Sequence, residues 1–155
     1  MKSEEGYRSS SHELIFQWEE KGMKYLDVDL YCEAARVIAS VYKKSFTFKP
    51  KAVDVMEEIL ECYHKDYINK TLDEELMYQI VGVFGIYLGQ VMLLTGLSDC
   101  GYKWEEDDGH PCLTNKMCKL FPISKVQKRI TYGKGHDVRL FYDMAMDFAK
   151  RQSSK

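Results

Sequence analysis

The sequence has no arrangement of residues that specifies a reaction, and its cysteines are few and scattered. They are Cys32, Cys62, Cys100, Cys112 and Cys118. None has the paired Cys-x-x-Cys type of spacing that is typical of zinc sites, and their odd number does not predict a disulfide framework. The first six residues have neither an apolar core nor a small-residue cleavage site, so no signal peptide is predicted. These absences predict a cytoplasmic protein without a metal or a cofactor.

The chain also lacks a strong charge of either sign. The net charge of its 155 residues is −2, which argues against a general nucleic-acid-binding protein with a strongly basic face. The composition, 45% hydrophobic and 30% charged residues, is typical of a globular protein. No internal repeat, linker or low-complexity tract divides the chain. We therefore expect a disordered N-terminus over residues 1–9 and a single globular domain over residues 10–152.

Residues 76–98 contain no charged side chain, and this segment is long enough to cross a membrane. Its other features favour a buried helix. It contains the amides Gln79 and Gln90, four acidic residues follow at 105–108, and no cluster of Lys or Arg at one end would orient an insertion. A helix that is apolar nearly all round normally lies at the centre of a globular fold. We predict a buried central helix over residues 72–97, begun by a capping box of Thr71 and Glu74.

The glycines of this segment fall on one helical face, edged by the two amides, and bulky residues, among them Leu94, cover the opposite arc. They are Gly82, Gly85, Gly89 and Gly96. We favour close packing of a second helix or a strand on this flat face. The alternative is a ligand that approaches the backbone there, and a homodimer through the same face is a third interpretation. The candidate ligand face consists of Gln79, Gly82, Gly85, Gly89 and Gln90.

The rest of the chain predicts amphipathic elements separated by turns. Helices are expected over residues 10–22, 27–44, 50–67 and 137–151, and a hairpin or three-stranded meander over residues 102–121. Pro122 begins a short helix that ends at Gly133, although a strand competes for this segment. The last helix is expected to turn inward Val138, Phe141, Met144, Ala145 and Phe148. The fold class is therefore mainly helical α+β, with about five to six helices around the central helix.

Three local groupings could carry chemistry, and each has a simpler explanation. Cys100, His110, Cys112 and Cys118 are metal-ligand types without metal-ligand spacing. His110 and Cys112 would share one face of a strand, but catalytic dyads are normally assembled from distant parts of a chain. The acidic run at 105–108 is typical of a solvated turn, which keeps carboxylate pKa values low. We assign no catalytic residue and expect a protein that is not an enzyme.

Charge is segregated along the C-terminal third. An acidic hairpin precedes a basic stretch that contains Lys116, Lys119, Lys125, Lys128, Arg129, Lys134 and Arg139. Either the two regions pair with each other across the surface, which we favour, or they form a two-signed surface for a protein partner. Trp104 is an anchor of the core or, less favoured, of an interface. The candidate partner-binding residues are Trp104, Asp107, Asp108, Lys125, Lys128 and Arg129.

Several short motifs carry a resemblance to small bacterial proteins. They are Tyr87-Leu-Gly-Gln, Trp104, Pro122-Ile-Ser-Lys-Val-Gln-Lys-Arg-Ile130, Gly133 and Phe141-Tyr142. The chain resembles uncharacterised domains of unknown function, some of them immunity proteins encoded beside interbacterial toxins. The likeness covers roughly the C-terminal half. It brings no catalytic residue and implies a bacterial cytoplasmic protein that binds another protein.

The functional expectation is a non-enzymatic protein-binding module of the immunity type, with a toxin or another protein as its partner. The alternative is a small-molecule-binding protein or a minor enzyme that uses the Gly82, Gly85 and Gly89 face.

Overall fold

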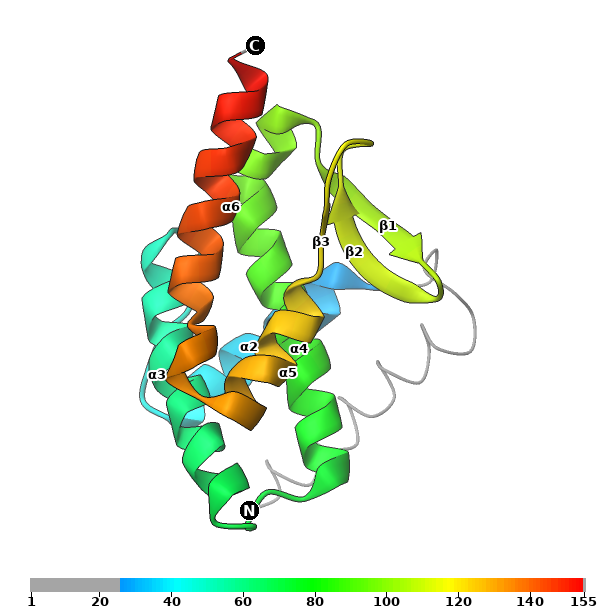
Figure 1. Ribbon diagram of the computed structural model, residues 1–155. Helices are drawn as coiled ribbons and strands as arrows, with labels where there is room; N and C mark the ends of the chain where they lie inside the picture. The colour runs from blue at the N-terminus through cyan, green and yellow to red at the C-terminus, as the bar shows by residue number, and fades with distance from the viewer. Residues whose placement is uncertain (1–25, 155) are drawn as a thin grey trace.

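The structure is a computed structural model that describes residues 26–154. The expected disorder over residues 1–9 and the expected helix over residues 10–22 lie outside the described residues. The described helices are α2 (Val28–Val41), α3 (Lys51–Ile68), α4 (Glu74–Met92), α5 (Pro122–Tyr132) and α6 (Val138–Ser153). The strands β1 (Lys103–Asp107), β2 (His110–Thr114) and β3 (Lys119–Leu120) form one antiparallel sheet in the order β1-β2-β3. The predicted fold class, mainly helical α+β, is confirmed (Figure 1).

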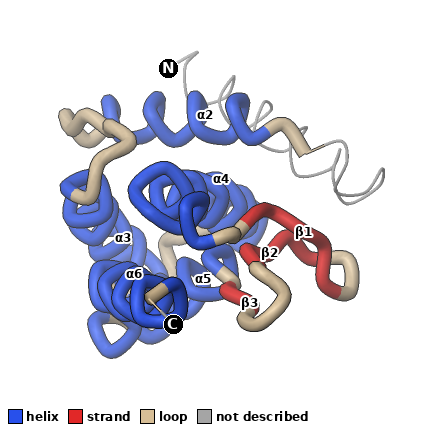
Figure 2. Tube along the Cα trace, turned by 90° about the horizontal axis from the view of Figure 1, so that it is seen from above, coloured by secondary structure: helices blue, strands red, loops and turns tan. Residues whose placement is uncertain are grey.

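Helix α4 is the centre of the fold, as the uncharged segment predicts. Helix α2 packs on one side of it, and α3, α5 and α6 lie on the other side (Figure 2). Among the described residues, Glu74–Cys100 is the one helical stretch long and apolar enough to cross a membrane. Within it, 78% of the most apolar 18-residue segment is buried inside the protein. The neighbouring helices therefore supply the apolar surroundings that a bilayer would otherwise provide.

Both ends of α4 differ from the prediction. The N-cap is Asp73, whose Oδ1 accepts from the Glu75 amide at 2.9 Å. Thr71 is not the cap because α4 begins after Asp73, and the amide and hydroxyl of Thr71 both donate to the carbonyl of Asp66 near the end of α3. At the other end, α4 leads into Leu93–Leu97, where the backbone of Gly96 (φ 166°, ψ −33°) departs from helical geometry and kinks the chain. Leu94, expected on the bulky inward arc, is exposed just before this kink.

The segment after α4 folds as the predicted three-stranded meander. Trp104 pairs with Leu113 in the first hairpin, and Leu113 pairs with Leu120 in the second. The first turn uses Asp108 (φ 51°) and Gly109 (φ 81°), and two positive φ values are typical of the tight hairpin turns that match strand twist.

The segment after the sheet is helical, and the competing prediction of a strand is wrong. Pro122 occupies the first turn of α5, where its missing N–H leaves no hydrogen bond unmade. Gly133 (φ 89°) ends the helix. Helix α6 begins after Asp137, whose Oδ1 accepts from the Leu140 amide at 3.0 Å. The chain therefore turns back sharply, so that α6 runs beside α5 and α3.

Candidate functional site

The glycine face of α4 is a packing surface. A Cβ atom added to Gly85 would lie 2.5 Å from the Cα atom of Ile123 in α5, and one added to Gly89 would meet the ring of Trp104. Gly82 is also buried. The favoured prediction of close packing is thus confirmed at Gly85 by a helix and at Gly89 by a strand. α5 and β1 fill the space directly beside these two glycines, which leaves no room there for a ligand or a second copy.

The two amides at the edge of this face differ in their partners. The indole Nε1 of Trp104 donates to Oε1 of Gln90 at 3.3 Å. Trp104 is therefore half-buried and packs against the core, as the favoured prediction has it. Gln79 is only 3% exposed, and its Oε1 accepts no hydrogen bond from the described residues.

Arg129 does not belong to a partner-binding surface, because its side chain is completely buried. Its Nε lies 3.0 Å from Oε1 of Glu57, and its Nη2 lies 3.0 Å from Oε1 of Glu61. Both glutamates come from α3. Oε1 of Glu57 also accepts from the Val138 amide at 2.7 Å. We call Arg129, Glu57 and Glu61 the buried ion cluster. It joins α5, α3 and the first turn of α6.

The pKa of Glu61 reflects this arrangement. Burial acts to raise the pKa of Glu61, but the hydrogen bond and charge of Arg129, helped by Lys134 and His64, outweigh burial and lower it below the ordinary value. Both glutamates are partly accessible, with side chains 16% and 25% exposed, while the guanidinium is not. The carboxylates therefore face water on one side and the arginine on the other.

Some of the other charges in the C-terminal third pair within the protein, and others do not. Asp107 accepts from Lys119 of β3 at 2.9 Å, and this hydrogen bond raises the pKa of Lys119. The acidic hairpin therefore pairs with a neighbouring strand instead of the basic helix α5. Asp108 is exposed at the turn. Lys125 and Lys128 on α5 make no ion pair with any described residue within 4.0 Å, and they remain available to a partner.

The scattered cysteines do not assemble a site in the described part of the chain. No three His, Cys, Asp or Glu side chains converge there in an arrangement that could hold a metal ion. Cys112 is buried, and burial, followed by the charge of Asp107, raises the pKa of its thiol. His110 lies at the exposed end of the same strand. A raised pKa disfavours the thiolate that a nucleophilic role would need.

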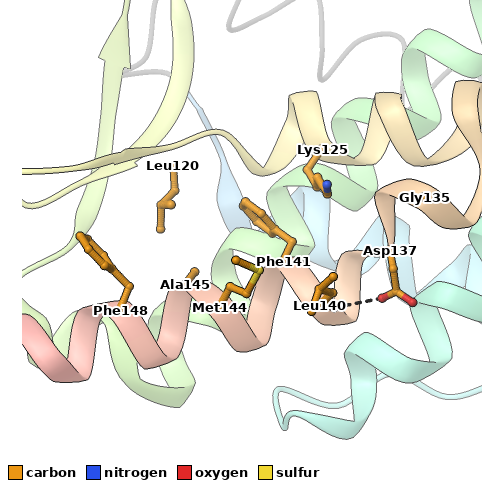
Figure 3. A pocket seen from close by; sticks show the side chains of 9 residues that line it. All are labelled: Leu120, Lys125, Gly135, Asp137, Leu140, Phe141, Met144, Ala145 and Phe148. Carbon is orange, nitrogen blue, oxygen red and sulfur yellow. Dashed lines mark hydrogen bonds between the residues drawn. The ribbon is translucent and has the colours of Figure 1, made fainter.

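The strongest candidate for a functional surface is an apolar groove that the sequence pattern did not reveal (Figure 3). It lies between α6 and the wall formed by α5 and β3, and its volume is about 340 Å³. Leu140, Met144 and Phe148 are 58%, 64% and 47% exposed along its rim. We refer to it as the α6 groove, and its lining residues are Leu120, Lys125, Gly135, Asp137, Leu140, Phe141, Met144, Ala145 and Phe148.

The groove corrects the prediction for α6. Met144 and Phe148 were expected to point inward, but the inner face of α6 is formed by Val138, Tyr142, Ala145, Met146 and Ala149. The available signal was the number of apolar residues in α6, which exceeds what one buried face requires. Leu140, Met144 and Phe148 recur every four residues and therefore form a stripe beside the buried face.

Charge at the groove is positive on one wall. Nζ of Lys125 lies 6.0 Å from the ring centre of Phe141. The carboxylate of Asp137 caps α6 by accepting from the Leu140 amide, and it keeps its negative charge beside Leu140. Lys125 is the cation among the residues that line the groove, and it is left without an ion pair (Figure 3).

Comparisons with protein-family models, with curated proteins and with solved structures found no match for this chain.

Proposed function

We propose that the protein is a non-enzymatic protein-binding module and that its partner docks in the α6 groove. The observation that carries this proposal is the row of exposed apolar side chains at Leu140, Met144 and Phe148, beside the unpaired Lys125. Exposed apolar patches with a polar rim are typical of protein interaction sites. The occupant we infer is a polypeptide segment that combines apolar anchors with acidic side chains.

A polypeptide fits this groove better than a metabolite does. Small-molecule sites usually bury most of their ligand in a concave pocket with several converging polar groups. The α6 groove lies along a helix surface, its rim side chains are about half exposed, and one free charged group lines it. Acid–base or nucleophilic chemistry would require a second positioned group beside Lys125.

The resemblance to immunity-type bacterial proteins adds support for a protein partner. The motifs that carry it include Pro122–Ile130 of α5 and Phe141 of α6, which lie in the two walls of the groove. We propose on this basis that the protein acts in the bacterial cytoplasm and that its partner is a toxin or a comparable protein.

The test compares three immobilised baits in extracts of the source organism: the parent chain, Met144→Ser and Val41→Ser. Val41 is a matched control because it is 61% exposed, like Met144, but lies on α2, on the opposite side of α4 (Figure 2). Each captured protein is then purified and titrated against the three baits by calorimetry. We expect a partner that binds the parent and Val41→Ser equally and Met144→Ser more weakly. Equal binding by all three baits, or no protein that distinguishes them, would overturn the assignment of the groove.

A further inference from the structure

We propose that the segment bound by the α6 groove is an acidic amphipathic α-helix that lies along α6. This inference rests on the proposed protein-binding function and specifies the shape and charge of the partner segment.

The shape follows from the stripe on α6. Leu140, Met144 and Phe148 are spaced four residues apart, so they lie nearly in line and span about 12 Å along the helix axis. A straight apolar row of two turns matches a second helix that presents anchors at positions i, i+4 and i+7 or i+8. Leu120 from β3 and Phe141 from α6 point into the space between the two walls (Figure 3). A third row of apolar side chains from a partner helix would fill the space between them.

The charge follows from which groups are already paired. On α6, Asp143 is bound by Arg139 at 3.1 Å and Asp147 is bound by Arg151 at 2.7 Å, so these side chains carry little net charge toward a ligand. On α5, Lys125 lines the groove and Lys128 is exposed one turn further along the helix, outside the lining. Neither lysine has an ion pair among the described residues. The α5 side of the groove is therefore positive, and a partner helix would place its acidic side chains against that side.

These charges also favour a different protein over a second copy of this chain. A second α6 would supply the same apolar stripe, but its carboxylates Asp143 and Asp147 are held by its own arginines. It would therefore bring no free acid to meet Lys125 and Lys128. Self-association through the groove would bury Lys125, which lines it, without a partner, and this is unfavourable.

The test is a selection from a displayed library of three-turn helical peptides, in which the anchor positions are fixed as Leu or Phe and the flanking positions are random. Enriched peptides are synthesised with a fluorescent label and titrated against three proteins. These are the parent, the charge-reversed variant Lys125→Glu/Lys128→Glu, and a control, Lys43→Glu/Lys70→Glu. The control changes the charge equally at two exposed lysines that follow α2 and α3.

We expect enriched peptides to carry Asp or Glu on one flank and to bind the control as tightly as the parent. Two exposed ion pairs contribute up to about 1 kcal/mol each, so the charge-reversed variant should bind about tenfold more weakly. Added salt should weaken binding to the parent. Carbon-13 chemical shifts of a labelled peptide should be helical when bound, and amide shifts of the protein should change along α5 and α6.

Enriched peptides that are neutral or basic, or extended when bound, would overturn the inference. So would a solution dimer, measured by sedimentation, that is lost in Met144→Ser. The extract experiment separates the two proposals. If a captured partner needs Met144 for binding but its bound segment is neither acidic nor helical, this inference alone is refuted. If acidic helical peptides bind the groove but the extract yields no partner that needs Met144, the proposed function alone is refuted.

Discussion

Replacing Arg129 with methionine should lower the free energy of unfolding by about 3 kcal/mol. Methionine keeps the apolar stem of the side chain but removes a guanidinium that is completely buried between Glu57 and Glu61. Removing one partner of a buried ion pair typically costs about 3–5 kcal/mol, because the remaining charge is left without compensation. The two carboxylates here are partly exposed and can gain some water, so the lower end of this range applies.

The assay is urea unfolding at pH 7, followed by far-ultraviolet circular dichroism. Lys128→Met is the matched control, because Lys128 precedes Arg129 in α5 and is exposed. A surface substitution of this kind should change the free energy of unfolding by no more than about 0.5 kcal/mol. If Arg129→Met were as stable as Lys128→Met, the reasoning that the buried ion cluster holds α5, α3 and α6 together would be refuted.

The contribution of Glu61 should also depend on pH in a defined direction. Its pKa is lower in the folded protein than its ordinary value, so the unfolded chain binds more protons at acidic pH. The stabilisation is complete above the ordinary pKa and is lost as the pH falls through the lowered one. The difference in stability between the parent and Glu61→Gln should therefore shrink between about pH 5 and pH 3. A difference that grows as the pH falls would contradict this sign.

Three further predictions concern the central helix and the thiols. Gly85→Val should lower the urea midpoint strongly, because its first side-chain atom would lie 2.5 Å from the backbone of Ile123; a stability within about 0.5 kcal/mol of the parent would refute close packing there. Asp73→Ala should reduce the free energy of unfolding by about 1 kcal/mol through loss of the N-cap, and no change would mean that another group caps α4. With a thiol-specific reagent at pH 8, the exposed thiol of Cys62 should react at once. The thiol of Cys32 is buried, and burial raises its pKa to about 12, so Cys32 should react only after unfolding. Equal reaction rates for the two thiols would contradict this prediction.

Local signals in the sequence predicted most elements of the fold because they act over a few residues. Pro122 and Gly133 mark the two ends of α5, and the Asp108-Gly109 turn marks the first hairpin. The glycine stripe of α4 predicted a close packing surface, since the absence of side chains there admits another backbone. The cap of α4 was mispredicted because Thr71 has a competing acceptor in α3, which no pattern around Thr71 reveals.

The candidate site was less predictable, because charge and exposure depend on which elements meet. Arg129 follows the exposed Lys128 in a basic stretch, and its sequence neighbourhood suggested a surface residue. Its partners Glu57 and Glu61 lie 72 and 68 residues away in the chain. Similarly, Met144 and Phe148 of α6 were expected to face the core, and only the packing of α6 on its neighbours leaves them largely exposed.

The sequence by itself determined that a long uncharged segment would lie at the centre of a mainly helical fold, because such a segment must be surrounded by apolar surface. It also determined the small antiparallel sheet and the positions of most chain reversals, through Pro, Gly and Asp. The tertiary structure alone decided which charges are neutralised and which apolar side chains stay exposed. Both depend on contacts between residues far apart in the chain, and from those contacts come the buried ion cluster and the α6 groove with its free Lys125.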